Sequence, residues 1–550
     1  MCGIAGMIGD GWAPAQFETL FDGISHRGPD HSGVHQSGNF RLGMNRLHIR
    51  GKAVPLPFNN GEAVAAFNGQ IYGYFGDDDV HVALASGLAE EISVVRDTPA
   101  TRIDGMYACV LADPAGEDLL LTTDRQFIKP LFYRCSEEGA AFCSEFVPLA
   151  RVGKSNSIHF GALAELFTYG WYLSDQTYLS SIRTVCHSDL CLSGGRLTEI
   201  SKPLPSVEIP PEDPIPHIRQ RIQESVRQCL VGRGPFGLAL SGGLDSSILA
   251  WEINAAGIED LVTISVIMAE TGDGLPTLED LRLPAGGAWE TWRHHTVVVD
   301  GSWDFLSAFK DSTLMFGHPT NMSSLPLFQL IAETAAKNGV RVLLSGEGVD
   351  EFFAGYASYR SVGTQVGVLG YYGHQPRLAL IRRLFGEKVL ASTQEHFVER
   401  YGKCPELRPV ERELRLARLL LRTDICLMSQ SVEGRVPFLH NRIPELALSI
   451  PWERHVAGQG KALLREAYAR QVAQQTRTTK TRFKISDDVL RRLMNDETVT
   501  ARVISSAGNV FGASSTRESI EALATDAGFD SDICCLLLSL TFLIEEGFVI

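Results

Sequence analysis

One short stretch of the chain, Leu238 to Ser247, has the residue types of a phosphate-binding turn. The apolar run Phe236 to Leu240 predicts a buried strand, glycines and hydroxyls follow it, and a helical pattern continues from Ile248. Glycines let the backbone approach an oxyanion, and the first free N–H groups of a helix point at it. The stretch therefore predicts an anion cradle whose expected occupant is a phosphate.

The residues of this turn also indicate which phosphate it binds. The Gly-x-x-x-x-Gly-Lys-Ser/Thr loop that grips β and γ phosphates is absent from the sequence here. The carboxylate of Asp245 would repel a bare phosphate, so a Mg²⁺–phosphate unit is the natural ligand. Ser-Gly-Gly-x-Asp-Ser at a strand-to-helix turn resembles the pyrophosphate loop of the ATP pyrophosphatase superfamily, which cleaves ATP between its α and β phosphates.

A second chemical feature lies at the start of the chain, where Cys2 follows Met1. If Met1 is removed, the thiol gains a free α-amine that can serve as its base, so no histidine partner is needed. Further on, Asn68 and Gly69 place a side-chain amide beside a backbone N–H, two neutral donors suited to an oxyanion. The sequence therefore predicts a self-contained nucleophile and an oxyanion site.

The motifs around these residues resemble the N-terminal-nucleophile (Ntn) glutaminase domain of class II glutamine amidotransferases. They are Met-Cys-Gly-Ile at the start, His26-Arg27-Gly28-Pro29-Asp30, Arg46-Leu47, Asn68-Gly69, Asp124-Arg125 and Pro130-Leu131. The resemblance implies that Cys2 attacks the amide carbon of glutamine while Asn68 and Gly69 hold the oxyanion. It also implies that glutamine is bound by Arg46 at its carboxylate, by Asn68, and by Gln70 and Asp79 at its α-ammonium.

Two departures from this family concern the ammonium of glutamine. The family usually has Glu where this chain has the neutral Gln70, and the stretch between Tyr72 and Asp79 is markedly shorter than the family's. Loss of one negative charge near a bound ammonium costs on the order of 1 kcal/mol. We therefore expect a glutaminase that is weak, conditional or partly displaced by free ammonia.

Two later motifs extend the resemblance to nearly the whole chain. Ser-Gly-Glu-Gly-Val-Asp-Glu at 345–351 again follows an apolar strand, and its Asp350 can join Asp245 as a second Mg²⁺ ligand. With the phosphate turn and Val-Glu-Gly-Arg-Val-Pro-Phe-Leu at 432–439, this motif resembles the synthetase domain of the glutamine-dependent asparagine synthetase family. The resemblance implies that ATP contacts Leu240, Ser241, Gly243, Asp245, Ser246, Val266, Ser345 and Gly346.

The same resemblance assigns three further side chains to the reaction. Lys461 matches the family lysine that faces the reacting acyl phosphate, where it would neutralise charge on the α-phosphate. Glu347 and Tyr356 would shape the acceptor side and assist deprotonation of the amine. Asp424 matches a family acidic position, although Ile425 stands where an arginine usually follows.

The implied reaction is an ATP-dependent amidation of a carboxylic acid. A carboxylate is a poor electrophile, and transfer of AMP to its oxygen provides a leaving group that ammonia can displace. The substrates are then glutamine, ATP and a carboxylic acid, with Mg²⁺ bound to the pyrophosphate. Because ammonia protonates quickly in water, we expect an internal apolar passage between Cys2 and the phosphate turn.

The sequence leaves the acceptor acid open. Aspartate, giving asparagine, is the leading acceptor, but the arginine that several asparagine synthetases carry before the Ser-Gly-Glu strand falls at Met322. A second carboxylate on the substrate would want a cation nearby. The alternatives are another acid of specialised metabolism, an intramolecular amide or lactam closure, and a non-catalytic regulatory protein with this fold. The intact Cys2 and Asn68 argue against ring closure, which needs no ammonia.

The elements that must position these residues divide the chain in two. A proline-rich linker at 201–216 separates them, and beyond it alternating strands and helices predict a parallel doubly wound sheet, whose ligand lies outside the carboxyl ends of its strands. We expect an α/β fold. By the resemblance, residues 1–200 form an αββα Ntn glutaminase domain, and residues 217–550 form a doubly wound ATP pyrophosphatase domain with a helical C-terminal part.

Composition limits the partners and the cellular compartment that we expect for this protein. The formal charge of −15 over 550 residues argues against a nucleic-acid partner. Eleven scattered cysteines without a Cys-x-x-Cys pair favour a reducing cytoplasm. The longest apolar run, Ile533 to Ile544, is too short to span a bilayer and predicts a buried helix, so no membrane partner is expected. The family resemblance suggests a homodimer.

Overall fold

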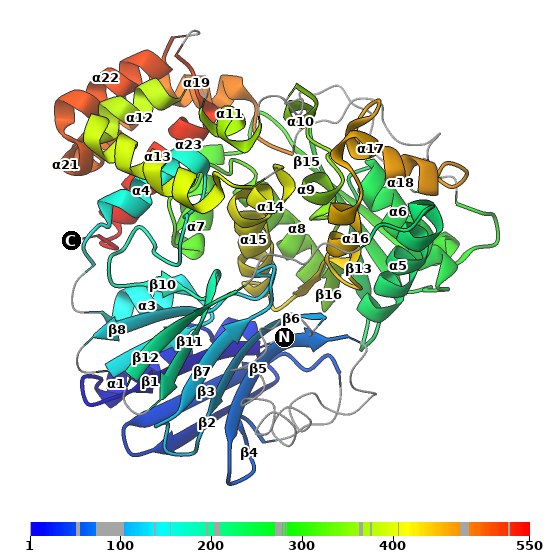
Figure 1. Cartoon of the computed structure of the whole chain (residues 1–550), viewed down its shortest axis with the longest axis horizontal. Helices are drawn as coiled ribbons and strands as arrows, with labels where there is room; N and C mark the ends of the chain where they lie inside the picture. The colour runs from blue at the N-terminus through cyan, green and yellow to red at the C-terminus, as the bar shows by residue number, and fades with distance from the viewer. Residues whose placement is uncertain are drawn as a thin grey trace.

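The computed structural model describes residues 2–50, 55–72, 104–136, 139–153, 156–193, 196–202, 209–269, 278, 281, 283–361, 367–373, 377–404, 406–472, 483–525 and 528–549. Asp79, which the sequence places at the ammonium of glutamine, lies outside these residues. Two antiparallel sheets occupy the N-terminal part, and a parallel sheet with many helices occupies the C-terminal part (Figure 1).

The first N-terminal sheet has the strand order β10-β8-β9-β1-β3-β2, and the second has the order β12-β11-β7-β6-β5-β4. The strands of the first are β10 (Arg183–Thr184), β8 (Phe132–Ser136), β9 (Gly139–Cys143), β1 (Cys2–Ile8), β3 (Phe40–Arg46) and β2 (His31–Ser37). Those of the second are β12 (Arg196–Ser201), β11 (Ser188–Ser193), β7 (Leu119–Thr123), β6 (Gly105–Ala112), β5 (Val64–Ile71) and β4 (Phe58–Asn59).

Alternation along β1 explains how the first sheet is covered on both faces. Ile4 faces the second sheet and packs in a buried cluster with Val64, whereas Ala5 faces the opposite side and packs with Phe17. Phe17 belongs to α1 (Pro14–Asp22), which lies beside α3 (Phe146–Val152) and near the short helix η1 (Ser25–Arg27); α4 (Phe160–Tyr169) follows later in the chain. The result is a layered α/β arrangement with Cys2 at the start of a buried strand.

The C-terminal sheet is entirely parallel and has the order β15-β14-β13-β16-β17. Its strands are β13 (Phe236–Ala239), β14 (Leu261–Met268), β15 (Arg293–Val299), β16 (Val342–Leu344) and β17 (Glu433–Arg435). The strand order reverses between β13 and β16, so the turns that follow these two strands meet at the topological switch point, where open α/β sheets bind ligands. Both Ser-Gly motifs of the sequence occupy those turns.

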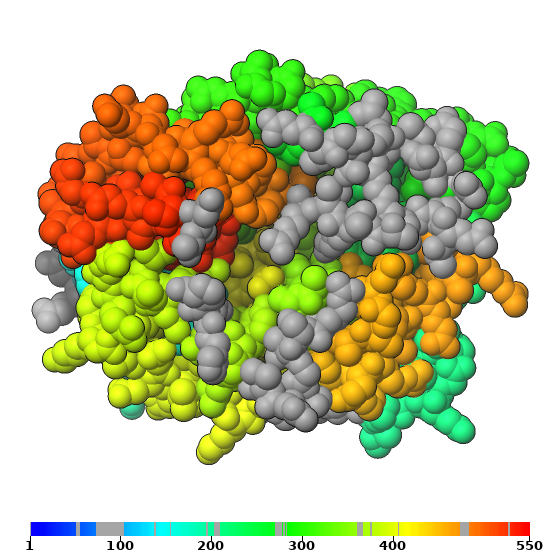
Figure 2. All heavy atoms as spheres, turned by 90° about the horizontal axis from the view of Figure 1, so that it is seen from above, coloured from blue at the N-terminus to red at the C-terminus, as the bar shows by residue number. Residues whose placement is uncertain are grey.

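Helices surround this sheet and continue to the C-terminus. They are α5 (Pro214–Cys229), α6 (Leu244–Ala255), η5 (Ala288–Thr291), α7 (Phe305–Phe316), α8 (Leu325–Lys337), α9 (Val349–Phe352), α10 (Ala357–Ser361), α11 (Gly367–Gly373), α12 (Leu378–Phe385), α13 (Glu387–Tyr401), α14 (Arg408–Glu411), the π-helix η6 (Arg412–Leu416), α15 (Ala417–Met428), η7 (Pro437–Leu439), α16 (Ile443–Ser449), α17 (Trp452–Val456), α18 (Ala462–Ala467), α19 (Asp487–Asn495), α20 (Glu497–Ser506), α21 (Gly508–Phe511), α22 (Ala513–Leu523) and α23 (Ser531–Glu545). Seen from above, the orange and red C-terminal helices lie at one end of the face and the α17–α18 region at the other (Figure 2).

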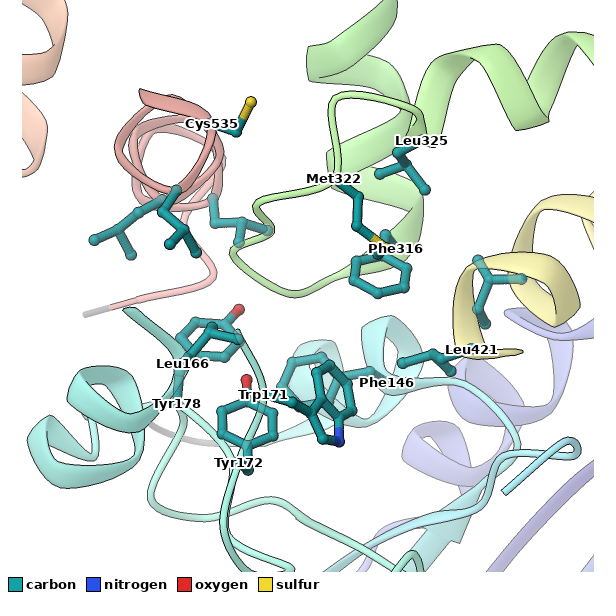
Figure 3. Packing of buried hydrophobic residues seen from close by; sticks show 14 of the residues in the cluster. Phe146, Leu166, Trp171, Tyr172, Tyr178, Phe316, Met322, Leu325, Leu421 and Cys535 are labelled. Atoms are coloured by element: carbon teal, nitrogen blue, oxygen red, sulfur yellow. The ribbon is translucent and has the colours of Figure 1, made fainter. Parts of the chain in front are cut away.

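The two parts share one hydrophobic core. Phe146, Trp171 and Tyr178 from the N-terminal part lie close to Phe316, the last residue of α7, and to Met322 in the loop after that helix (Figure 3). Met322 is 6% exposed, so the side chain at the position of the family arginine is buried among apolar groups. The described residues contain no helix that is long and apolar enough to cross a membrane, and α23 is the buried helix predicted from its apolar run.

Candidate active sites

The nucleophile site is built on β1, β3 and β5. The backbone nitrogen of Cys2 donates to Asn68 Oδ1 at 2.9 Å, and Cys2 lies opposite Arg46 in the β1–β3 register. Cys2 is only 4% exposed, and burial raises the pKa of its thiol, while the nearby charge of Arg46 acts in the opposite direction. The thiol therefore needs a base to become a nucleophile, and the nitrogen beside it is held in place by Asn68.

The predicted oxyanion donors lie together on β5. Asn68 Nδ2 is buried and has no hydrogen-bond partner among the described residues, so it is a donor available to a bound oxyanion. Gly69 has a φ of +136°, and a Cβ atom there would lie 1.9 Å from the carbonyl oxygen of Met106, so only glycine fits. Gln70 is buried next to them, and its Oε1 likewise lacks a partner within the described ranges.

The phosphate turn connects β13 to α6 and is closed by its own hydroxyls. The backbone N–H of Ser241 donates to Ser246 Oγ at 3.2 Å, and Ser247 Oγ donates to the carbonyl of Gly243 at 2.8 Å. Gly243 is the N-cap of α6, which leaves the first turn of the helix facing the loop. The second turn approaches closely, since a Cβ on Gly346 would lie 2.9 Å from Asp245 Cβ.

The other positions expected to contact ATP lie at the same edge of the sheet. Leu240 follows β13 and its N–H donates to Ile264 of β14 at 2.8 Å. Val266 is in the second half of β14, and Ser345 directly follows β16. The structure therefore brings all eight predicted ATP-contacting positions to the carboxyl ends of neighbouring parallel strands.

Lys461 joins the two carboxylates of these turns. Its Nζ lies 2.8 and 2.6 Å from the two carboxylate oxygens of Asp245 and 2.7 Å from Asp350 Oδ1. Burial opposes its charge, but the two carboxylates raise the pKa of Lys461 above its ordinary value. Gly355 makes room for this pair, because a Cβ there would lie 1.9 Å from Asp350 Oδ1.

The same two carboxylates are the donors that fit Mg²⁺. Asp245 and Asp350 come from adjacent turns and face one cation, which in this structure is the ammonium of Lys461. Among the residues described, no group of three or more His, Cys, Asp and Glu could hold a metal ion. A magnesium ion here would take only two protein carboxylates and would need phosphate oxygens and water for its remaining positions.

Glu347 lies within the second turn, between β16 and α9, and is held by residues of α15. It accepts a hydrogen bond from Thr423 Oγ1 at 2.6 Å and forms an ion pair with Arg422. Burial raises the pKa of Glu347, although Arg422 acts in the opposite direction. Arg422 was not predicted from the sequence, because nothing local to it indicates that it reaches a carboxylate 75 residues earlier in the chain.

Tyr356 contacts a second glutamate that the sequence analysis did not single out. Its hydroxyl donates to Glu351 Oε1 at 2.7 Å, and Arg415 lies over its ring at 4.4 Å from the centroid. Glu351 is the last residue of the Ser-Gly-Glu motif, so it was visible in the pattern. Its burial was not, since α9 turns it inward beside Asp350.

The protonation of Glu351 should make stability depend on pH. Burial, with the charge of Asp350 added to it, raises the pKa of Glu351 from about 4.5 to about 7. The native state then holds a proton that the unfolded chain releases, so this carboxyl lowers the free energy of unfolding as pH rises through that window. Glu351→Gln has no such proton to release. Between pH 4.5 and 8, its free energy of unfolding should therefore rise by about 1–3 kcal/mol relative to that of the wild type. Urea unfolding at pH 4.5 and at pH 8 measures this, and Glu62→Gln, at an exposed position, is the control. If the free energies of unfolding of Glu351→Gln and wild type differ by the same amount at both pH values, the raised pKa is contradicted.

The fold and the two sites define a glutaminase joined to an ATP-binding synthetase. Comparison with known families agrees: the asparagine synthase family model matches residues 217–527, and the glutamine amidotransferase domain model matches 1–85 and 89–196. The protein is therefore a glutamine-dependent carbon–nitrogen ligase. The chain belongs to the asparagine synthase family.

The chain is only distantly similar in sequence to the named proteins that it matches. It is 26% identical over 485 residues to asparagine synthetase B (glutamine-hydrolysing) of Escherichia coli, covering 81% of this chain and 74% of that protein. A probable asparagine synthetase of Schizosaccharomyces pombe is 27% identical over 480 residues, covering 81% and 75%. Amidase chry2 of Gibberella zeae is 25% identical over 423 residues, covering 66% of this chain and 60% of that protein.

Proposed function

We propose that the enzyme amidates a carboxylic acid through an acyl-AMP intermediate, with aspartate as the leading acceptor. The observation that carries this proposal is the cluster of Lys461, Asp245 and Asp350 at the switch point of the parallel sheet. Such a cluster suits a Mg²⁺–pyrophosphate unit on the two carboxylates and an ammonium group available to the α-phosphate. The E. coli and S. pombe relatives, which are named asparagine synthetases, support the choice of aspartate.

In the proposed reaction the acceptor carboxylate attacks the α-phosphorus of ATP and pyrophosphate leaves. The turns around Ser241, Ser246 and Gly346 hold the pyrophosphate, and Lys461 offsets charge that develops on the α-phosphate. Magnesium, when bound by Asp245 and Asp350, supplies further positive charge to the phosphates. Ammonia then attacks the acyl carbon, AMP leaves, and Glu347 takes a proton from the attacking amine.

The ammonia comes from glutamine at the other end of the molecule. The thiol of Cys2 attacks the amide carbon, the tetrahedral oxyanion is held by Asn68 Nδ2 and the N–H of Gly69, and ammonia leaves. Water then releases glutamate from the acyl-enzyme. In this proposal Arg46 pairs with the carboxylate of glutamine, Gln70 and Asp79 lie near its ammonium, and an internal passage carries ammonia to the acyl-AMP.

A panel of acids tests the reaction and identifies the acceptor. Purified enzyme with ATP, Mg²⁺ and glutamine should release AMP and pyrophosphate with at least one acid, aspartate first. Release of ADP, or no AMP with any acid, would contradict the proposal and favour a non-catalytic role. The boundaries at 200 and 217, a homodimer and a cytoplasmic location stay predictions.

One observation favours an acceptor other than aspartate as the second candidate. Met322 occupies the position of the family arginine and lies in the core between the two parts of the chain (Figure 3). That position therefore offers no cation to a second carboxylate on the substrate. An acid with a single carboxylate would need no cation at that position. The panel of acids distinguishes such an acceptor from aspartate.

Glutamine hydrolysis should be slow at low glutamine concentrations. The neutral, buried Gln70 offers no charge to the ammonium of glutamine, a loss of about 1 kcal/mol or about fivefold in affinity. Gln70→Glu should therefore lower the KM for glutamine by about fivefold. Glutaminase assays with and without ATP and acceptor measure this, and rapid uncoupled turnover of the wild type at low glutamine would contradict it.

A further inference from the structure

The helix α15 connects the nucleophile site to the acceptor side through three consecutive residues. Toward the glutaminase, Asp424 binds Arg27 at 2.6 Å and Lys129 at 3.3 Å. Arg27 Nε also donates to the carbonyl oxygen of Cys2 at 3.4 Å. The side chain of Arg27 therefore bridges the carboxylate of Asp424 and the main chain of Cys2.

Toward the synthetase, the two residues before Asp424 hold Glu347. Thr423 Oγ1 donates to one carboxylate oxygen of Glu347, and Arg422 pairs with the other while also donating to Ser324 Oγ at 3.0 Å. The path from Cys2 through Arg27, Asp424 and Thr423 to Glu347 is thus continuous. In Figure 1, α15 lies in the centre of the molecule, above the N-terminal strands.

The ion cluster at the start of this path is sealed from solvent. The side chains of Arg27, Lys129 and Asp424 are at most 1% exposed. In such surroundings a charge pair cannot be replaced by water, so a shift of either partner has to be followed by the other. A displacement of the Cys2 main chain on acylation would therefore be passed to α15.

From this geometry we infer that Asp424 is a positioning residue that couples the state of Cys2 to Glu347. The inference rests on the proposed function, in which Cys2 becomes acylated and Glu347 meets the amine. It assigns a role to the acidic position noted in the sequence. Acylation of Cys2 then alters the turn that carries Glu347 before ammonia arrives.

A purely structural clamp is the competing explanation, and the chain offers a matched control for it. Arg125 of the glutaminase pairs with Glu445 of α16 at 3.0 Å, also between the two parts and largely buried. Within the described part of the chain, no hydrogen bond or ion pair links that pair to Cys2 or to Glu347. Glu445→Gln removes a charge pair between the same two parts without interrupting the path.

The test labels Cys2 with the diazoketone analogue of glutamine (diazo-oxo-norleucine) and follows amide exchange of residues 342–352. In the wild type, labelling should change exchange of this segment by about fivefold or more. Asp424→Asn, which leaves Arg27 bound to Glu145 and Lys129 bound to the carbonyl of Gly434, should reduce the change to less than about twofold. Glu445→Gln should respond as the wild type does.

A second variant tests the same path in case Asp424→Asn does not fold. Thr423→Val keeps Asp424 but removes the hydroxyl bound to Glu347, and it should also lose the response. An unchanged response in both variants, equal loss in Glu445→Gln, or no response in the labelled wild type would overturn the inference. Intact mass reports the adduct, and its absence in the wild type would instead overturn the proposed function of Cys2.

Discussion

A Lys461→Ala variant should form AMP at about one hundredth to one thousandth of the wild-type rate. Lys461 is the cation within hydrogen-bond distance of both Asp245 and Asp350. A preorganised charge at a developing phosphate charge contributes about 3–4 kcal/mol to such a step. The backbone and hydroxyls of the phosphate turn remain, so the Kd for ATP should change by less than about tenfold.

The measurement separates binding from chemistry. Equilibrium binding of ATP is compared with pyrophosphate release at saturating ATP and acceptor, and Lys484→Ala is the matched control. Lys484 forms a local ion pair with Asp487 at 2.6 Å on a half-buried surface, outside both sites, and its removal should leave turnover unchanged. Unchanged turnover in Lys461→Ala would reject a role at the α-phosphate.

The same variant tests the predicted metal ligands. Without the ammonium, Asp245 and Asp350 face each other, and their repulsion should lower the free energy of unfolding by about 3 kcal/mol. Mg²⁺ can take the place of the ammonium, so it should raise the Tm of Lys461→Ala more than that of the wild type. Equal shifts would contradict the assignment of these two carboxylates to Mg²⁺.

The phosphate turn was predictable because its determinants are local. A strand, a glycine turn and a helix within about ten residues predict their own geometry, and β13, Gly243 and α6 confirm the prediction. The sequence analysis places Pro214 and Pro216 in the linker at 201–216, whereas in the structure these two prolines lie in the first turn of α5. The helix begins at Pro214 with Asp213 as its N-cap, since proline is tolerated in the first helical turn.

The contacts that bind these elements together could not be predicted. Lys461 meets Asp245 across 216 residues, and the partners of Glu347 lie 75 and 76 residues away. Only the fold brings such groups together, and no local pattern encodes the pairing. Met322 shows the converse, because its burial in the core shared by both parts depends on packing from Trp171 and Phe146, which come from the other domain.

A Cys2→Ala variant should lose glutamine-driven synthesis by about a thousandfold or more while retaining synthesis from free ammonia within about twofold. The thiol is the nucleophile in the proposed hydrolysis, and the backbone nitrogen beside it, held by Asn68 at 2.9 Å, has nothing to activate once the sulfur is gone. The synthetase site is formed by β13, β14, β16 and α18, which the substitution does not touch.

The fold should tolerate this change, because alanine removes only one buried sulfur atom from the cluster between the two sheets. Cys109→Ala is the matched control: Cys109 lies on β6, burial raises the pKa of its thiol to about 12, and its removal should leave glutamine-driven synthesis unchanged. Product formed with glutamine and with ammonium chloride is measured for both variants. Loss of the ammonia-driven reaction in Cys2→Ala would mean that the two sites are not separable, and persistence of the glutamine-driven reaction would mean that Cys2 is not the nucleophile.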